Sequence, residues 1–547
     1  MNNDSIRLIR PEWGNWDAIY EQFQWNIPEH FNIAHMACDR HTEHSGDSIA
    51  IYCENKAGET SQFTFSDLKR LSNQLANVLQ HYGVEKGDRV GIVLPQRSET
   101  VISHLAIYKL GAIALPLSVL FGPEAVGYRL NNSGTKVVIT DSAHVELIES
   151  IRDELPALET IIDCDNDSGF WSLLEKASDC FEIVNTMSED PAYLVYTSGT
   201  TGPPKGALAP HRCLIGNLTG FEMSHNFFPQ ENDLFWTPAD WAWTGGLLDA
   251  LIPSLYYGMP VLGYDGGKFD AEKACHLMEK YHVRNSFIPP TALKMLRQLG
   301  DFRKKFDIQM RTIMSAGESL GSELFFWGKE AFGIEVNEMW AQTEFNYICG
   351  NCAEVMEVRP GSIGKSYPGH RVEPVDENGT ALPVGEIGEL AADRDDPVMV
   401  AGYWKNEKAT RDKFIGQWWA TGDMGYKDDE GYIWFVGRKD DVISSAGYRI
   451  GPGEIEDCLI KHPAIAQVAV VGVPDELRGE AVKAYIVLKP GEFPSETLTD
   501  DIQNSVKKRL AAYEYPRMIE YIDDLPLTTT GKVKRNELRA RHIEESS

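Results

Sequence analysis

Residues 196–206 gather side chains that can bind phosphate. The segment reads Y-T-S-G-T-T-G-P-P-K-G, with hydroxyl side chains, three glycines and one lysine. Such a loop can wrap its backbone N–H groups and hydroxyls around phosphate oxygens. Its spacing, G-x-x-G-x-x-K, differs from that of a Walker A loop. The apolar run Ala192–Val195 precedes it, which predicts a loop directly after a buried strand and disfavours a flexible Gly/Ser linker.

Three further segments could complete the chemistry of a phosphate site. Gln342-Thr343-Glu344 follows an apolar run and offers a hydroxyl donor beside a carboxylate, a ligand that Mg²⁺ favours together with phosphate oxygens. Asp423 lies in a Thr-Gly-Asp triplet, and its carboxylate could accept charge-assisted hydrogen bonds. Lys532 follows a glycine and could bring a positive charge to the site. Lys532 also opens the basic run KVKR, so the alternative interpretation is a solvated charge run.

The elements that must position these residues alternate between buried strands and helices. We expect strands at Arg89–Pro95, Ala112–Leu117, Lys136–Thr140, Val283–Ile288 and Arg311–Ser315, and helices at Ser98–Leu110, Ala271–Tyr281 and Thr291–Leu299. Strands separated by helices of this length indicate crossover connections and largely parallel sheets with helices on both faces. The pattern therefore predicts a large α/β domain.

The pattern changes near Gly437. A helix is expected from Pro452, with Glu454 and Glu456 in its first turn, where they suit the helix dipole. The elements expected after it are strands at Gln467–Val473, Val482–Leu488 and Met518–Ile522 and a helix at Leu498–Ala511. Together they predict a small α+β module of about 110 residues.

Composition narrows the range of partners. The 547 residues carry a net charge of −29, which argues against nucleic acid because its phosphates require clustered Lys and Arg. No stretch approaches the ~20 apolar residues that span a bilayer, and the polar start carries no secretory signal. Nine cysteines are sparse for this length, so we expect a reduced, cytoplasmic compartment. The oligomeric state stays open, with a homodimer as one option.

Taken together, these segments resemble the adenylate-forming enzymes, a family that includes acyl-CoA synthetases, firefly luciferase and the adenylation domains of peptide synthetases. The segments that match the family's motifs, in the family's order, are 196–206, 339–344, 421–423, 437–441, 447–456 and 530–532. The resemblance covers about residues 30 to 540. Within the family, the C-terminal half looks most like the medium-chain acyl-CoA synthetases.

The resemblance implies an ATP site and assigns roles within it. The residues that it places at ATP or AMP are Thr197, Ser198, Gly199, Thr200, Thr201, Lys205, Gly317, Glu318, Gln342, Thr343, Asp423, Arg438 and Arg449. Thr343 and Glu344 would hold the α-phosphate and Mg²⁺, with Glu344 as the metal ligand. Asp423 and Arg438 would hold the ribose. The implied catalytic residues are Lys532, Thr343 and Glu344.

The resemblance also implies a small domain that moves. Residues 1–439 would form the AMP- and acyl-binding domain, which includes a small β subdomain, and residues 440–547 would form a mobile domain with its hinge at Asp440. In one arrangement Lys532 serves adenylation. In the other, Ser445, Ala446 and Gly447 line a channel for the pantetheine arm of coenzyme A, and a glycine there admits close approach of a ligand.

The implied acyl pocket combines small residues with one aromatic, and its members are Trp243, Ala316, Gly317 and Ala341. Ala341 stands where acetate-specific relatives have tryptophan, so the pocket should admit acids longer than acetate. No charged residue is among these positions, which favours an aliphatic acyl tail. Trp241 could refill part of the space, and a short branched or aromatic acid also stays compatible.

The predicted function is ATP-dependent activation of a short- to medium-chain carboxylic acid to acyl-AMP, followed by transfer of the acyl group to coenzyme A. ATP, Mg²⁺ and coenzyme A are the expected cofactors and co-substrates. The alternatives are an adenylation enzyme that loads a separate carrier protein, a luciferase-like oxygenase and an inactive nucleotide-binding protein. Intact Lys532, Glu344 and Asp423 disfavour the inactive protein.

Overall fold

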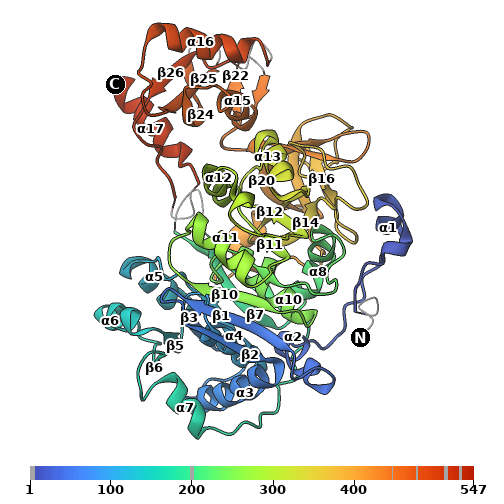
Figure 1. Ribbon diagram of the computed structural model, residues 1–547, viewed down its shortest axis with the longest axis vertical. Helices are drawn as coiled ribbons and strands as arrows, with labels where there is room; N and C mark the ends of the chain where they lie inside the picture. The colour runs from blue at the N-terminus through green and yellow to red at the C-terminus, as the bar shows by residue number, and fades with distance from the viewer. Residues whose placement is uncertain are drawn as a thin grey trace.

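Four β-sheets divide the chain into a large and a small domain. The computed structural model describes residues 6–197, 203–445, 448–475, 479–510, 515–528 and 532–546. The large domain contains three of the sheets. The small domain, drawn in red in Figure 1, lies at one end of the molecule.

The first sheet carries the predicted phosphate loop between two of its strands. In spatial order its strands are β18 (Gly402–Tyr403), β8 (Lys205–Pro210), β7 (Pro191–Thr197), β4 (Ile113–Pro116), β3 (Arg89–Val93), β5 (Val137–Thr140) and β6 (Thr160–Asp163). From β7 to β6 the neighbours are parallel, whereas β8 pairs antiparallel with both β7 and β18. The helices that connect the parallel strands are α4 (Ser98–Lys109), α5 (Pro123–Ser133) and α6 (Ser142–Ser150).

The second sheet has nine strands and a parallel centre. In spatial order they are β15 (Lys365–Ser366), β14 (Phe345–Gly350), β13 (Val336–Gln342), β12 (Thr312–Ser315), β11 (Asn285–Phe287), β9 (Phe235–Trp236), β10 (Val261–Asp265), β1 (Ile49–Asn55) and β2 (Thr60–Thr64). Neighbours from β13 to β1 are parallel, and the strands outside them are antiparallel. Ligands of such sheets bind outside the carboxyl ends of the parallel strands.

Two helices of the large domain are buried on every side. All residues of α4 and of α8 (Cys213–Ser224) are buried, and both helices belong to one core cluster that includes strands of both sheets. A helix without a polar face belongs in the interior, so this core joins the two sheets into one domain.

The other helical segments of the large domain are shorter or have a solvent-exposed face. The α-helices are α1 (Trp16–Gln22), α2 (Ile33–Ala37), α3 (Phe65–His81), α7 (Phe170–Lys176), α9 (Thr244–Gly246), α10 (Ile252–Tyr256), α11 (Ala271–Lys280), α12 (Pro290–Gln298), α13 (Ser322–Phe332) and α14 (Glu407–Arg411). A π-helical turn spans Leu247–Leu251, and 3₁₀ turns span Pro11–Trp13, Asp39–Glu43, Arg152–Glu154 and Phe302–Lys304.

The third sheet is the predicted β subdomain and is antiparallel throughout. Its strands are β16 (Val372–Val375), β17 (Gly388–Asp393), β20 (Trp418–Lys427), β19 (Phe414–Ile415) and β21 (Ile433–Arg438). The register of β20 and β21 places Asp423 directly opposite Arg438. Two residues with predicted roles at the ribose are therefore neighbours across one strand pair.

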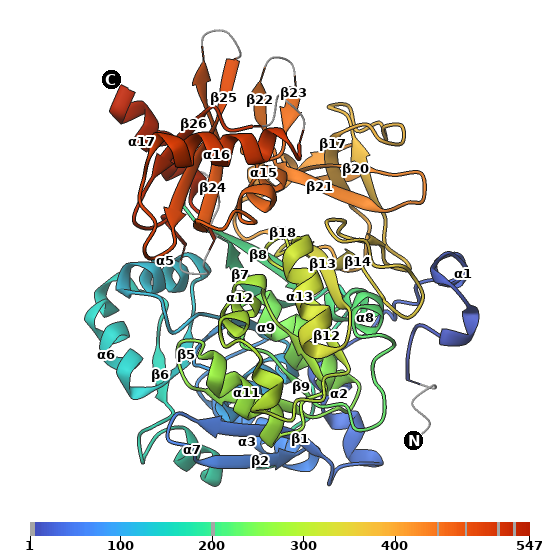
Figure 2. The same ribbon diagram turned by 45° about the horizontal axis from the view of Figure 1, so that its top comes forward.

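The small domain is a mixed sheet with three helices. Its strands are β23 (Tyr448–Ile450), β22 (Ile443–Ser445), β25 (Gly479–Leu488), β24 (Ile465–Asp475) and β26 (Met518–Tyr521), and its helices are α15 (Pro452–Leu459), α16 (Glu496–Lys507) and α17 (Arg535–Ser546). Its apolar clusters are separate from the core of the large domain. Figure 2 shows α15 next to β21 of the large domain, and residues of these two elements are in contact.

The sequence predicts this architecture closely. The large α/β domain, its β subdomain and the small α+β domain are confirmed. The helix predicted at Ser98–Leu110 is observed at Ser98–Lys109, and the strand predicted at Lys136–Thr140 at Val137–Thr140. Strands β24 and β25 are longer than predicted because Ile465 of β24 also pairs with Leu488, and Pro474 and Asp475 pair with Glu480 and Gly479 of β25.

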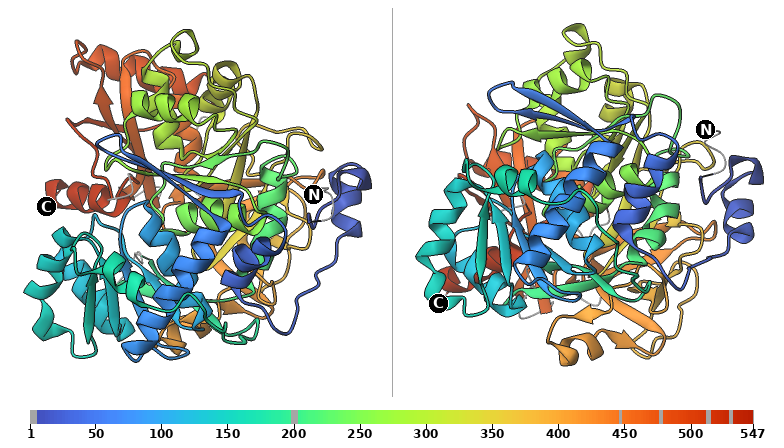
Figure 3. Two further views of the ribbon diagram at one scale, coloured as in Figure 1. Left: turned by 60° about the horizontal axis from the view of Figure 1, so that its bottom comes forward. Right: turned by 90° about the horizontal axis from the view of Figure 1, so that it is seen from below.

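The aromatic N-terminal segment packs against the large domain. Trp16 is buried, with its ring 5.7 Å from that of Tyr367, and Trp25 donates its indole N–H to the Gly369 carbonyl at 2.7 Å. Figure 3 shows this segment, in dark blue, along the outside of the domain. Among the residues that the structure describes, no helix is long and apolar enough to cross a membrane.

Candidate active site

The predicted phosphate loop begins and ends on a strand pair. Strand β7 ends at Thr197 and β8 begins at Lys205, and these two residues are partners in the ladder. The predicted strand before the loop is therefore confirmed. The loop residues Ser198, Gly199, Thr200 and Thr201 lie outside the described residues.

Lys205 is linked to Glu344 through Tyr403. The Lys205 ammonium lies 5.3 Å from the centre of the Tyr403 ring, and the Tyr403 hydroxyl donates to Oε1 of Glu344 at 2.5 Å. Tyr403 is buried on β18, and burial, reinforced by the Glu344 charge, raises its pKa above the ordinary range. The hydroxyl therefore keeps its proton at neutral pH and remains a donor to the carboxylate.

Thr343 and Glu344 form the turn between β13 and β14. This turn lies at the carboxyl end of β13, the edge of the sheet where ligands bind. The side chain of Glu344 is held by Tyr403, and its backbone carbonyl accepts the Val400 amide at 3.0 Å. A carboxylate that is held in place beside a hydroxyl and a phosphate loop has the donor chemistry that Mg²⁺ requires.

Asp423 already has three hydrogen-bond donors. Oδ1 accepts from Arg438 at 2.7 Å, and Oδ2 accepts from the Trp340 indole at 3.0 Å and from the Gln342 amide at 2.9 Å. A carboxylate offers about four lone-pair positions, so two ribose hydroxyls fit only if one donor leaves. Arg438, whose side chain is 39% exposed, is the donor best able to move, while Trp340 is buried.

Lys532 of the small domain faces the same site. Loss of hydration lowers the pKa of its ammonium group, whereas the negative charges of Glu318 and Asp423 raise it and Arg438 lowers it. The residue is nevertheless exposed to solvent. The carboxylate of Glu318 is in turn held by the Thr291 hydroxyl at 2.9 and 3.1 Å.

The predicted hinge lies in an exposed turn. Asp440 follows β21, the last strand of the large domain's third sheet, and precedes β22 of the small domain. The adjacent Asp441 forms an ion pair with Arg539 at 2.9 Å, which ties the end of this turn to α17. Of the predicted coenzyme A channel, Ser445 is buried in β22, while Ala446 and Gly447 and the Arg449 side chain lie outside the part that the structure describes.

The residues of the predicted acyl pocket lie at or near the same edge of the second sheet. Ala316 directly follows β12, and Ala341 is near the end of β13. Gly317 has φ +91° and open space where a Cβ would stand, so the backbone is accessible to a ligand there. Trp243 is half-buried, with its ring 5.7 Å from Phe121.

Trp241 belongs to the same apolar cluster as Ala316, and Ala341 and Trp243 pack against that cluster. Trp241 is fully buried, and a Cβ built on Gly263 of β10 would lie 2.8 Å from its ring. Its position is set by packing against the sheet.

Several residues at the site were not predicted from the sequence. They are Trp340, Glu389, Tyr403 and Lys413. Lys413 is half-buried and donates to the Ala420 carbonyl at 3.1 Å; desolvation lowers its pKa and the Glu344 charge raises it. Glu389 accepts the Gly422 amide at 2.8 Å and so holds the residue before Asp423. Trp340 lies within the motif segment 339–344, although no role was predicted for it, and no local pattern marks Glu389, Tyr403 or Lys413 as part of the site.

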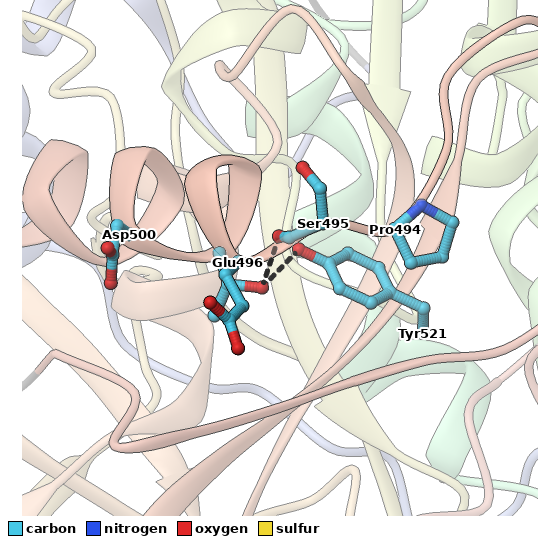
Figure 4. Close-up of a pocket in the computed structure, with 6 residues that line it drawn as sticks. Pro494, Ser495, Glu496, Asp500 and Tyr521 are labelled. Atoms are coloured by element: carbon cyan, nitrogen blue, oxygen red, sulfur yellow. Dashed lines mark hydrogen bonds between the residues drawn. The ribbon is translucent and has the colours of Figure 1, made fainter.

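Two other features carry no chemistry of this kind. Cys349 and Cys352 are buried, their thiols contact different groups, and the described residues contain no cluster that could hold a metal through His, Cys, Asp and Glu alone. A shallow depression on the small domain, shown in Figure 4, is lined by Pro494, Ser495, Glu496, Thr499, Asp500 and Tyr521. Its Thr499 and Tyr521 hydroxyls bond to each other at 2.9 Å.

Comparison with known proteins identifies the family. Residues 38–404 match the AMP-binding enzymes, and residues 454–532 match the AMP-binding enzyme C-terminal domain. The chain belongs to the AMP-binding enzyme family. This AMP-binding enzyme thus carries both family domains, joined by the segment that contains Asp440.

Relatives match this AMP-binding enzyme over nearly its whole length. Acetyl-coenzyme A synthetase of Bacillus subtilis (strain 168) is 37% identical over 96% of this chain and 95% of its own. Mitochondrial acyl-coenzyme A synthetase ACSM3 of Rattus norvegicus is 35% identical over 99% of this chain and 96% of its own. A crystal structure of the anthranilate CoA ligase AuaEII with anthranoyl-AMP has a TM-score of 0.86 at 31% identity, covering 95% of this chain and 99% of that one.

Replacement of Tyr403 by Phe tests whether its hydroxyl positions Glu344. Removal of a residue that orients a metal ligand typically costs 10- to 100-fold in metal affinity or activity, so we expect Tyr403→Phe to weaken the apparent Mg²⁺ constant by about 10-fold. The ring over Lys205 is retained. The measurement is ATP–pyrophosphate exchange over a range of Mg²⁺ concentrations.

Tyr432→Phe is the matched control, because the Tyr432 hydroxyl donates to the Glu357 carbonyl in the same domain and has no contact with Glu344. Equal Mg²⁺ constants for the two variants would contradict a role of Tyr403 at the metal site.

Proposed function

We propose that this AMP-binding enzyme is an AMP-forming acyl-CoA synthetase. It activates a short- to medium-chain carboxylic acid with ATP and transfers the acyl group from acyl-AMP to coenzyme A. The observation that carries this proposal is the position of Lys532 opposite Glu318 and Asp423, in a chain whose full-length relatives are coenzyme A ligases. The alternative of loading a carrier protein has no such support among these relatives.

In the first half-reaction the carboxylate of the acid attacks the α-phosphorus of ATP. A bond forms between the carboxylate oxygen and phosphorus, and the bond from the α-phosphorus to the bridging oxygen breaks with loss of pyrophosphate. Both reactants are anions, so the enzyme must supply positive charge where negative charge grows. Lys205 of the loop and Lys532 of the small domain provide ammonium groups on either side of the nucleotide, and Thr343 donates a hydroxyl.

Asp423 anchors the nucleotide through its ribose while this happens. Gln342 and Trp340 keep the carboxylate oriented, and Arg438 moves away from Oδ1 when the sugar binds. Glu344 would hold Mg²⁺, which supplies charge neutralisation at the phosphates when bound. Fixed geometry of this kind lowers the barrier by avoiding reorganisation during the reaction.

In the second half-reaction the thiol of coenzyme A, as thiolate, attacks the acyl carbonyl carbon of acyl-AMP. A thioester bond forms, and the mixed-anhydride bond breaks with loss of AMP. The small domain turns about Asp440, which removes Lys532 and brings Ser445, Ala446 and Gly447 to the acyl group. One cleft thus serves two reactions with different requirements.

The implied acyl pocket favours an aliphatic acid longer than acetate. Ala316, Gly317 and Ala341 are small residues at or near the carboxyl ends of β12 and β13, and no atom lies within 4 Å of a Cβ built on Gly317. The relatives differ in the acid that their names state, because they include an acetyl-coenzyme A synthetase and an anthranilate CoA ligase. Use of Mg²⁺, a cytoplasmic location and a homodimer stay predictions from the sequence and the family resemblance.

A pyrophosphate-release assay tests the function as a whole. Unbranched acids from C2 to C12 are supplied with ATP, with and without coenzyme A, and acyl-CoA is measured separately. A synthetase releases AMP, pyrophosphate and acyl-CoA in equal amounts. Turnover that needs a carrier protein in place of coenzyme A would contradict the proposal.

Replacement of Lys532 by Ala should separate the two half-reactions. Loss of one preorganised charge typically costs about 10²- to 10³-fold in rate, so acyl-AMP formation should fall by at least that factor. Transfer from supplied acyl-AMP to coenzyme A should change little, because Lys532 serves only the adenylating arrangement.

Lys534→Ala is the control for this variant, since Lys534 belongs to the same basic run and pairs with Glu537 at 2.8 Å. Equal loss of both half-reactions in Lys532→Ala would show that the two arrangements do not alternate as proposed.

Replacement of Ala341 by Trp tests the acyl pocket. The wild type should gain roughly fourfold in kcat/KM per added methylene until the pocket is full, because each buried methylene contributes about 0.8 kcal/mol. Tryptophan at this position should fill the space, so that longer acids lose activity through overpacking while acetate still fits. The measurement is a kcat/KM series from C2 to C8.

Ala341→Ser serves as the control, because it changes polarity with little change in volume. Acetate as the best wild-type substrate would contradict the assignment of Ala341 to the pocket, and the general synthetase function would stand.

A further inference from the structure

Helix α13 of the large domain lacks an N-cap side chain of its own. Its N-cap residue is Gly321, with φ +68° and ψ 153°, and no side chain of the adjacent residues accepts from its first amides. The first amides of a helix have no partner within the helix and carry partial positive charge. The segment directly before this helix contains Gly317 and Glu318, and Glu318 faces Lys532.

A residue of the small domain occupies this helix end. Asp457, on α15, approaches so closely that a Cβ built on Gly321 would lie 2.7 Å from Oδ1 and 3.1 Å from Oδ2 of its carboxylate. The carboxylate lies beside the backbone amide of Ser322, the first residue of α13, and this amide lowers the pKa of Asp457. Lys461, one turn after Asp457, donates to the Ser322 hydroxyl at 3.3 Å. The carboxylate at the N-terminus of α13 thus comes from the other domain.

The charges around Asp457 come from both domains. Burial is the largest influence and raises its pKa; Lys461, the Ser322 amide and Lys294 lower it, and Glu323 raises it. The carboxylate therefore lies in surroundings that are only partly favourable to its charge.

The segment between Gly317 and Ser322 is also held from the other side. Glu338 on β13 is buried and accepts the Leu320 amide at 3.0 Å. Burial is the largest influence on Glu338 and raises its pKa to about 7, with a further increase from the charge of Asp457. Glu338 belongs to the large domain and keeps this contact in any arrangement, whereas Asp457 makes its contact only when the small domain is docked as observed.

We propose that Asp457 is a positioning residue that caps α13 across the domain boundary and so favours the arrangement in which Lys532 faces the nucleotide site. This inference rests on the proposed synthetase function for its kinetic consequences. Rotation about Asp440 would carry α15 away from Gly321 and open the cap, so the cap stabilises only one of the two arrangements. The same contact holds the segment from Gly317 to Ser322, which contains Glu318, against the small domain that carries Lys532. The position of the small domain is thereby coupled to the nucleotide site.

Replacement of Asp457 by Ala should slow the first half-reaction alone. Loss of a cap residue corresponds to about 3- to 30-fold in an equilibrium constant, so acyl-AMP formation should fall by that factor. Transfer of the acyl group from supplied acyl-AMP to coenzyme A should be unchanged or faster, because the competing arrangement is less favoured. Asp457→Asn should stay within about threefold of the wild type, because Asn caps helices about as well as Asp.

Asp500→Ala is the matched control. Asp500 is an exposed acidic residue on α16 of the same domain, within the depression of Figure 4, and this variant should leave both half-reactions unchanged. Equal slowing of both half-reactions in Asp457→Ala would overturn the proposal, because it would indicate a general loss of structure.

Ser322→Pro tests the contact from the large domain. Proline is well accepted at the first position of a helix, and ψ 153° at Gly321 suits the residue before a proline, yet the amide that Asp457 needs is removed. This variant should reproduce the split between the half-reactions, and combining it with Asp457→Ala should add little further loss. Full additivity of the two variants would contradict a direct contact.

A measurement of domain position separates this inference from the proposed function. Spin labels on cysteines introduced at Lys304 and Glu492, both exposed and in different domains, report the distance between the domains in a Cys180→Ser background. The equilibrium constant between the two arrangements is measured with a non-hydrolysable ATP analogue bound. Asp457→Ala should lower this constant by about 3- to 30-fold, so that fewer molecules show the wild-type distance. An unchanged distance distribution would overturn the inference, even if the wild type activates no acid in the panel and the proposed function fails.

Discussion

An anionic nucleotide has to be bound by a protein with a net charge of −29, and the site is organised around that constraint. The acidic residues at the site accept hydrogen bonds from uncharged donors of the large domain: Tyr403 donates to Glu344, and Gln342 donates to Asp423, which also accepts from Arg438. Because these donors are neutral, they orient the carboxylates without consuming the positive charge that the phosphates need. The lysines, including Lys532, stay available for the substrate and for the charge that grows in the transition state.

Lys532 comes from the small domain and not from the domain that carries the rest of the site. The position of the small domain therefore decides whether Lys532 reaches the nucleotide. The large domain carries the phosphate loop, Asp423 and Glu344 on three sheets. One apolar core includes residues of all three sheets, so we expect this part of the site to move as one body. The small domain has cores of its own, and one of its polar contacts with the large domain is that of Lys461 with Ser322. A contact worth one or two hydrogen bonds, such as that of Asp457 with α13, can therefore bias its position without fixing it.

Much of this arrangement could be predicted from the sequence, because many of its determinants are local. Apolar periodicity predicts α4 within one residue, but it does not predict that every residue of this helix is buried, as the structure shows. Each segment that would touch the nucleotide is a short continuous motif. Its residue types and their spacing therefore suffice to find it in the sequence. Thr343 and Glu344 occupy a turn after a buried strand, where a short motif and its structural setting coincide.

Among the residues that orient Glu344 and Asp423, Gln342 was predicted at the site, whereas Tyr403 and the role of Trp340 were not. Tyr403 is 59 positions from Glu344, and Trp340 is 83 positions from Asp423; only the order of strands in the sheets brings these pairs together. A single sequence carries no spacing that encodes such contacts, since any residue that can donate a hydrogen bond would fit the local pattern. It follows that intact motifs do not by themselves establish activity. A relative with every motif residue in place could still lose catalysis through these supporting contacts, because an unoriented carboxylate is a poor ligand and a poor clamp.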